Sequence, residues 1–159
     1  MKSLIFGYGN TGQSVKKYLD TLSKQYLIYD DNLELLKDIN KELVFKKSQL
    51  DQVDEIVISP GIKPDHELLK NFPEHKVMTD IDLFSNEFKG TFIGVTGTIG
   101  KTTFVNLLSN FLNENGIKSI ACGNVGVSPL EFDSNQKIYA IVELSSFQLF
   151  YSKNLKLDF

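Results

Sequence analysis

The chain has 159 residues, 42% hydrophobic and 23% charged, values typical of a globular protein and not of a disordered one. The 17 Lys and Arg residues stand against 20 Asp and Glu, so the formal net charge is −3 and no basic field favours nucleic acid or an anionic membrane. One cysteine, Cys122, excludes an intrachain disulfide and favours a reducing compartment, and we expect it to be a small buried residue. No apolar run has the length of a signal peptide or membrane span. We therefore expect a cytoplasmic protein with no nucleic-acid partner and no membrane insertion. We also expect a monomer.

The chain begins with the pattern of a strand, a glycine-rich turn, a helix and a second strand. A buried strand at 3–6 leads into Gly7-Tyr-Gly-Asn-Thr-Gly12, with the spacing G-x-G-x-x-G, and helical apolar spacing continues to Leu22. The next apolar run, 26–29, ends in Asp30-Asp31-Asn32. Acidic residues about 20 positions beyond such glycines are typical of dinucleotide-binding folds, where a carboxylate lies near a ribose. The pattern favours a nucleotide or phosphate site over a tight turn without a ligand.

The alternation of strands and helices continues through the next fifty residues. The predicted elements are a short helix at 33–39, strands at 43–45, 55–58 and 76–78, a helix capped by Asp65, and a last short helix from Asp80. The turn Ser59-Pro-Gly-Ile62 follows one of these strands, at the end where ligands bind in open α/β sheets. His66 and His75 lack metal-ligand spacing, so we expect both to be solvated. Residues 85–90 are polar enough for a linker, so residues 1–88 are predicted to form a Rossmann-like parallel-sheet domain.

A phosphate loop is predicted after the strand at 92–95. Gly100-Lys-Thr-Thr103 precedes a segment with helical apolar spacing at 104–112. Glycines let backbone N–H groups converge on phosphate oxygens, Lys101 can reach the terminal phosphates, and the Thr102 hydroxyl can ligate Mg²⁺. The strict pattern G-x-x-x-x-G-K-[ST] has glycine where Val95 stands, so this is a variant loop with glycines on either side of that position.

The rest of the chain predicts two more strands, at 119–122 and 138–142. Gly116 suits a left-handed cap at the end of the preceding helix. The last strand ends in Glu143, a position typical of a second Mg²⁺ ligand beside a phosphate loop. The segment Leu144-Ser-Ser-Phe-Gln-Leu149 brings three polar side chains that could line the same cleft. Residues 89–159 are therefore predicted to be the first part of a P-loop NTPase-like central domain.

Six strings, in this order and over essentially the whole chain, resemble the Mur ligases of peptidoglycan synthesis. They are Gly7-Tyr-Gly-Asn-Thr-Gly12, Ser59-Pro-Gly-Ile62, Asp80-Ile-Asp-Leu-Phe84, Gly94-Val-Thr-Gly-Thr-Ile-Gly-Lys-Thr-Thr103, Gly123-Asn-Val-Gly126 and Val142-Glu-Leu-Ser-Ser-Phe-Gln-Leu149. The second and the last of these strings are specific to the branch that adds D-glutamate.

The resemblance implies an ATP-dependent amide ligase that uses ATP and Mg²⁺ to join D-glutamate to UDP-N-acetylmuramoyl-L-alanine through an acyl phosphate. It implies that the UDP-substrate is bound by Gly9, Asn10, Thr11, Asp31, Asn32, Ser59, Gly61, Asn124 and Gln148. It implies that ATP is bound by Gly97, Thr98, Ile99, Gly100, Lys101, Thr102 and Thr103. Lys101 and Glu143 are the implied catalytic residues, and Thr102 and Glu143 the implied Mg²⁺ ligands.

The chain departs from the family pattern at three places. Ile99 stands where the family usually carries Asn, which leaves a backbone cradle but not that side-chain contact. Asn32 stands where some relatives have Arg, so an ionic contact to the uridine diphosphate would be weaker. The family's central domain continues with a His ligand and a carboxylated Lys, and a third domain binds the amino acid, whereas this chain stops at Phe159. We therefore expect a fragment that binds the UDP-substrate without completing catalysis.

Two other classes of protein remain open on the sequence alone. The first is a nicotinamide-binding regulatory module, compatible with Asp30-Asp31 but without a downstream hydride-transfer site. The second is a P-loop switch or partitioning ATPase, which leaves Ser59-Pro-Gly-Ile62 unexplained. Binding of NADH would distinguish the first from a ligase, and a uridine-nucleotide thermal shift would distinguish the second.

Overall fold

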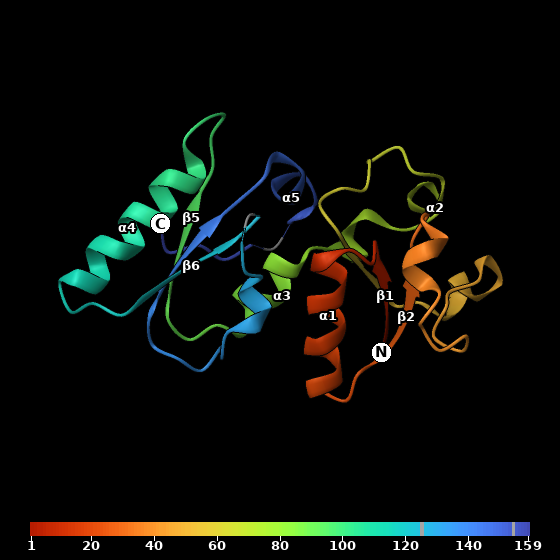
Figure 1. Cartoon of the computed structure of the whole chain (residues 1–159). Helices are drawn as coiled ribbons and strands as arrows, with labels where there is room; N and C mark the ends of the chain where they lie inside the picture. Colours follow the sequence, from red (N-terminus) through yellow and green to blue (C-terminus); the bar gives the residue numbers. More distant parts are fainter. Residues whose placement is uncertain (125, 154) are drawn as a thin grey trace. The chain divides into compact units, whose positions relative to one another are not determined.

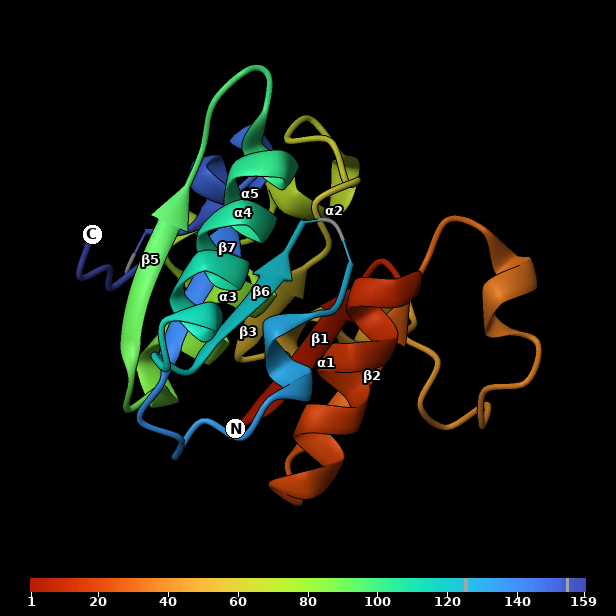
Figure 2. The ribbon, with the colours of Figure 1, turned by 60° about the vertical axis from the view of Figure 1, so that its left-hand side comes forward.

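The computed structural model describes residues 1–124, 126–153 and 155–159. The chain divides into two compact units, Met1–Asp80 and Ile81–Phe159, each built around its own parallel sheet (Figures 1 and 2). This confirms the predicted α/β class. The division lies eight residues before the predicted boundary between residues 88 and 89, and α3 (Asp80–Glu87) begins at it.

The sheet of the first unit has the strand order β2-β1-β3-β4, with all pairs parallel. Its elements are β1 (Lys2–Phe6), α1 (Asn10–Thr21), β2 (Gln25–Tyr29), β3 (Glu55–Ile58), α2 (Glu67–Lys70) and β4 (Val77–Met78), with the 3₁₀ helices η1 (Leu33–Leu36), η2 (Lys47–Gln52) and η3 (Glu74–Lys76). The apolar run of β1 is fully buried, because the strand is central and paired on both sides. The chain places β2 on one side of β1 and β3 on the other, so a topological switch point lies at the carboxyl ends of β1 and β3.

Three local predictions in this unit were wrong. The helix predicted at 33–39 is only the 3₁₀ turn η1. The strand predicted at 43–45 is reduced to an isolated bridge between Val44 and Ile28, because only Leu43 and Phe45 exchange backbone hydrogen bonds with the edge of β2. The cap of α2 is His66 and not Asp65, since the imidazole accepts from the Leu68 N–H.

The sheet of the second unit has the order β5-β7-β6, again with parallel pairs. Its elements are β5 (Thr91–Val95), α4 (Lys101–Glu114), β6 (Ser119–Gly123), the 3₁₀ helix η4 (Pro129–Glu131), β7 (Tyr139–Glu143) and α5 (Ser146–Tyr151). The central strand β7 buries Ala140, Ile141 and Val142 completely. Figure 2 shows α4 lying across one face of these strands.

The helix α4 ends as the sequence predicted, with Gly116 in the left-handed conformation at a φ of 77°. The N–H groups of Ile117 and Gly116 return to the carbonyls of Leu112 and Asn113, which is a Schellman motif. The apolar residues whose spacing predicted this helix are mostly not the residues that it buries. Val105 and Ser109 are buried, whereas apolar side chains on the adjoining face are exposed: Phe104, Leu107 and Phe111.

The linker predicted at 85–90 was wrong, because α3 continues to Glu87. The prediction rested on the polar residues of this segment and overlooked the aromatic side chain of Phe88. Its ring stacks on Phe84, with ring centroids 4.6 Å apart, and Phe92 of β5 meets Phe84 edge-on. These rings pack the end of α3 against the start of the sheet in the second unit. Within the described parts of the chain, no helix combines the length and apolarity needed to cross a membrane.

Candidate functional site

The glycine turn of the first unit lies at the topological switch point, and its outer glycines are required by the packing of the chain itself. Gly7 has a φ of 93°, and a Cβ there would lie 2.7 Å from the Cβ of Ser59. A Cβ on Gly12 would lie 2.0 Å from the carbonyl oxygen of Gly7. The Ser59 hydroxyl donates to the same oxygen at 2.9 Å and so ties the end of β3 to the turn. The turn and Ser59, predicted separately, therefore come together.

Gly9 differs from its neighbours, because no described part of the chain requires a glycine there. It precedes α1 with a φ of −71°, and no described atom lies within 4 Å of a Cβ built on it. Gly9 and Asn10 are exposed and Thr11 is half-buried. An open, side-chain-free backbone at the N-terminus of a twelve-residue helix fits the close approach of a phosphate group. Gly61, after β3, is also exposed with open space around its Cβ position.

Asp30 is the carboxylate that joins the end of β2 to the glycine turn. Its Oδ2 accepts from the Tyr8 N–H at 2.6 Å, and its Oδ1 accepts from the Asn32 N–H at 2.7 Å. The sequence analysis assigned UDP-substrate binding to Asp31 and Asn32 and gave no role to Asp30. The position of Asp30 as the first residue after β2 could have indicated that it contacts the glycine turn. The side chain of Asn32 caps η1 by accepting from the Glu34 N–H at 3.1 Å.

Replacing Asp30 with alanine is expected to lower the free energy of unfolding by about 2 kcal/mol, because it leaves the partly buried Tyr8 N–H without an acceptor. Asp30→Asn keeps one acceptor oxygen and is expected to lose about half as much. Urea denaturation followed by far-UV circular dichroism measures both. Equal midpoints for the alanine variant and the unchanged chain would show that Asp30 does not support the turn.

Asp31 lies in a small polar and aromatic cluster. Its side chain is 59% exposed, and its Oδ1 accepts from the Tyr29 hydroxyl at 2.8 Å. Burial and this hydrogen bond raise the pKa of Tyr29 to about 12, so the phenol remains a donor at neutral pH. The prediction that His66 is solvated was wrong: its Nε2 lies 3.2 Å from Asp31 Oδ2, and its ring meets Phe6 edge-on with centroids 4.8 Å apart. His75 is exposed, as predicted.

The glycine loop of the second unit connects β5 to α4 (Figure 1). Gly97 and Gly100 have φ angles of 149° and 80°, which L side chains rarely adopt. Ile99 is 93% exposed, so its side chain supports nothing in the loop and its backbone faces solvent. The Lys101 ammonium donates to the Gly97 carbonyl at 2.8 Å and lies folded over the loop. Exposed hydroxyl side chains lie within the loop and directly after it: Thr98, Thr102 and Thr103.

The two predicted Mg²⁺ ligands lie in direct contact. The Thr102 hydroxyl donates to Glu143 Oε2 at 2.6 Å, although the residues are 41 positions apart. The parallel register sets Glu143 beside Val95, the last residue of β5. The loop and the carboxylate therefore both lie at the carboxyl ends of these strands. Glu143 is only 3% exposed. A hydroxyl and a carboxylate oxygen form the hard donor set that Mg²⁺ prefers, and Mg²⁺ takes its remaining ligands from water and phosphates.

Asn124 and Gln148, both predicted to bind the substrate, differ in their exposure to solvent. Asn124 follows β6, is exposed, and donates its backbone N–H to the Glu143 carbonyl at 2.9 Å, which places it beside the loop. Gln148 is 1% exposed, and its Oε1 accepts from the Ser145 N–H at 3.0 Å in the capping box of α5. Its position thus supports the helix, and a contact to substrate stays a prediction. Val125, from the string at 123–126, lies outside the described residues.

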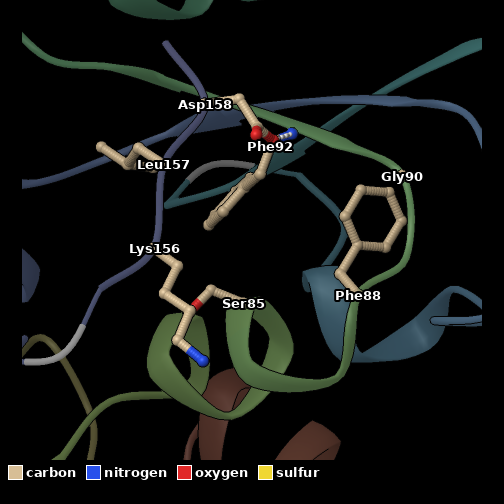
Figure 3. A pocket seen from close by; sticks show the side chains of 7 residues that line it. All are labelled: Ser85, Phe88, Gly90, Phe92, Lys156, Leu157 and Asp158. Carbon is tan, nitrogen blue, oxygen red and sulfur yellow. Dashed lines mark hydrogen bonds between the residues drawn. The ribbon is translucent and has the colours of Figure 1, made fainter.

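The second unit also contains a hollow of about 210 Å³ that none of the predicted site residues lines (Figure 3). Its lining residues are Ser85, Phe88, Gly90, Phe92, Lys156, Leu157 and Asp158. Asp158 accepts from the Phe92 N–H at 2.7 Å, and the segment that carries it bonds along the free edge of β5. None of these residues was predicted for binding.

The fold and the turns define an α/β protein with parallel sheets and with glycine turns at the carboxyl ends of the strands, where ligands bind in open α/β sheets. Residues 1–79 match the family description "Mur ligase MurD-like, N-terminal domain". The chain belongs to the Mur ligase family.

The relatives that the chain resembles carry the name UDP-N-acetylmuramoylalanine--D-glutamate ligase. The protein of Rickettsia prowazekii (strain Madrid E) is 41% identical over 158 residues, which cover 91% of this chain and 34% of the relative. That of Francisella philomiragia is 36% identical over 164 residues, covering 99% and 37%. That of Thermoanaerobacter sp. (strain X514) is 32% identical over 171 residues, covering 98% and 37%. The chain thus spans about a third of the length of these relatives.

Proposed function

We propose that this chain forms the substrate-binding and part of the ATP-binding portion of a ligase that joins D-glutamate to UDP-N-acetylmuramoyl-L-alanine in peptidoglycan synthesis. The name shared by the relatives supports this proposal. The structural observation that carries it is the contact of Thr102 with Glu143 beside the glycine loop. An ATP-dependent ligase needs a metal-binding pair of this kind at its phosphate loop, and a nicotinamide-binding module does not.

In this proposal the first unit binds the uridine diphosphate. The open backbone at Gly9 and Asn10 accepts the pyrophosphate at the N-terminus of α1, where N–H groups and the helix dipole favour an anion. Thr11, Ser59 and Gly61 border the same switch point. Asp31 at the end of β2 is an acceptor for donors of the nucleoside, since a carboxylate would repel a phosphate.

The second unit binds ATP with Mg²⁺. The loop at 97–100 supplies backbone N–H groups, Lys101 exchanges its contact with Gly97 for the terminal phosphates, and Thr102 and Glu143 hold the metal. When bound, Mg²⁺ offsets the charge that develops on the transferred phosphoryl group. Asn124 and Gln148 are retained in the proposal as contacts to the muramoyl group.

The chemistry consists of two transfers. A carboxylate is a poor acyl donor, so the γ-phosphoryl of ATP is moved onto the carboxylate of the L-alanyl group, giving an acyl phosphate and ADP. The amine of D-glutamate then attacks the acyl carbon, the amide forms, and inorganic phosphate leaves. The role of Lys101 is to hold and neutralise the terminal phosphate oxygens during the first transfer.

Uridine diphosphate is expected to raise the melting temperature of the chain by about 4 °C or more at a concentration a hundredfold above its dissociation constant. The reason is that a ligand that binds only the folded first unit stabilises it by mass action. Differential scanning fluorimetry measures the shift. NADH is the matched control, because it also contains a pyrophosphate but carries adenosine and a nicotinamide nucleoside in place of uridine. A larger shift with NADH would favour the nicotinamide-binding alternative, and no shift with uridine diphosphate would contradict the ligase proposal.

A further inference from the structure

His66 connects three parts of the first unit that are far apart in the sequence. It follows the turn after β3, its ring meets Phe6 of β1 and Tyr29 of β2 edge-on, and its Nδ1 accepts from the Leu68 N–H of α2 at 3.2 Å. The opposite ring nitrogen, Nε2, lies 3.2 Å and 3.3 Å from the two carboxylate oxygens of Asp31. The imidazole therefore bridges the first turn of α2 and the acidic end of β2.

The hydrogen bonds determine which nitrogen of His66 carries the proton. Because the Leu68 N–H can only donate, Nδ1 must be the acceptor and the proton resides on Nε2. Nε2–H then donates to Asp31, and the Tyr29 hydroxyl donates to the same carboxylate at 2.8 Å. Two donors from half-buried rings thus orient a carboxylate that is itself mostly exposed.

We propose that His66 is a positioning residue for uridine-nucleotide binding, which it serves by orienting the Asp31 carboxylate toward a hydrogen-bond donor of the nucleoside. This inference rests on the proposed function of the first unit. The pair of fixed donors leaves the solvent-facing lone pairs of Asp31 for a ligand hydroxyl or N–H, and a carboxylate held in one orientation loses less side-chain entropy when it binds.

His66 also has two structural tasks, capping α2 and packing against aromatic rings, so the test must separate these from positioning. Asparagine places its amide at the distance of Nδ1 from Cβ and is a strong helix cap, but it cannot reach Asp31. Glutamine places its amide nitrogen at the distance of Nε2 and can donate to Asp31, but it does not reproduce the cap. Both variants lose the ring and its packing equally, so each is the matched control of the other.

Isothermal titration of the whole chain with uridine diphosphate is expected to show that His66→Asn weakens binding about tenfold, whereas His66→Gln stays within about threefold of the unchanged chain. Urea denaturation is expected to rank the variants in the opposite order, with His66→Asn the more stable because it keeps the cap. In an Asp31→Ala background, His66→Asn is expected to have no further effect on affinity, since its contribution passes through that carboxylate.

The results distinguish this inference from the proposed function. If the unchanged chain binds uridine diphosphate and His66→Asn binds it equally well, or His66→Gln binds as weakly as His66→Asn, the positioning role of His66 is overturned and the ligase proposal stands. A tenfold loss that persists in the Asp31→Ala background also overturns it. If the unchanged chain does not bind uridine diphosphate, the proposed function fails and the inference on His66 fails with it.

Discussion

Gly12→Ala is expected to destabilise the first unit of the chain severely. The new Cβ would lie 2.0 Å from the Gly7 carbonyl oxygen, and Gly7 cannot retreat because its own Cα faces Ser59 on the end of β3. The clash is between backbone groups, so no rotamer change relieves it. We expect a loss of at least about 3 kcal/mol in the free energy of unfolding, the upper range for overpacking. Far-UV circular dichroism and urea denaturation measure it.

Gly9→Ala is the matched control within the same turn. An alanine there meets no described atom within 4 Å and has an ordinary backbone conformation, so stability is expected to change by less than about 0.5 kcal/mol. Its methyl group would instead occupy the space over the backbone where we propose that the pyrophosphate binds, and affinity for uridine diphosphate is expected to fall at least about tenfold. A stable Gly12→Ala chain would refute the steric reading of the turn. A Gly9→Ala chain with unchanged affinity would place the pyrophosphate elsewhere.

Glu143→Gln is expected to remove most of the magnesium-dependent binding of ATP while leaving the fold intact. The neutral amide oxygen can still accept from the Thr102 hydroxyl, but the charged ligand for Mg²⁺ is gone. Loss of one charged contact of this kind corresponds to about a tenfold to hundredfold weaker affinity. Isothermal titration with ATP, in excess Mg²⁺ and again in EDTA, measures the effect on the variant and on the unchanged chain.

Thr102→Ser and Thr102→Val provide the controls for this pair. Serine keeps the hydroxyl, so its affinity for ATP with Mg²⁺ is expected to stay within about threefold, whereas valine removes the hydroxyl with little change of volume and is expected to behave like Glu143→Gln. The role of Glu143 as a metal ligand is wrong if Glu143→Gln binds ATP with Mg²⁺ as tightly as the unchanged chain does. It is equally wrong if EDTA leaves the affinity of the unchanged chain unaltered.

The glycine turns and buried strands were predictable because their causes are local. A run such as residues 3–6 has no polar side chain to place in water after Ser3, and the glycines that follow mark where the backbone must turn sharply. Local signals failed where tertiary contacts decide the outcome. The predicted strand at 43–45 is a single bridge because it meets only the edge of β2. The predicted linker at 85–90 instead begins with the last turn of α3, and Phe88 just after it packs on Phe84.

The sequence by itself determined the α/β alternation, the positions of both glycine turns and the residue types available for an anion and a metal, since each depends on neighbours along the chain. Only the tertiary structure decided which of those residues meet. The parallel register brings Glu143 to Thr102 across 41 positions. The chain passes from β2 across β1 to β3, and this connection brings Ser59 to Gly7 and His66 to Asp31. The physical reason is that strand order and register are set by packing of the whole sheet, which no local window contains.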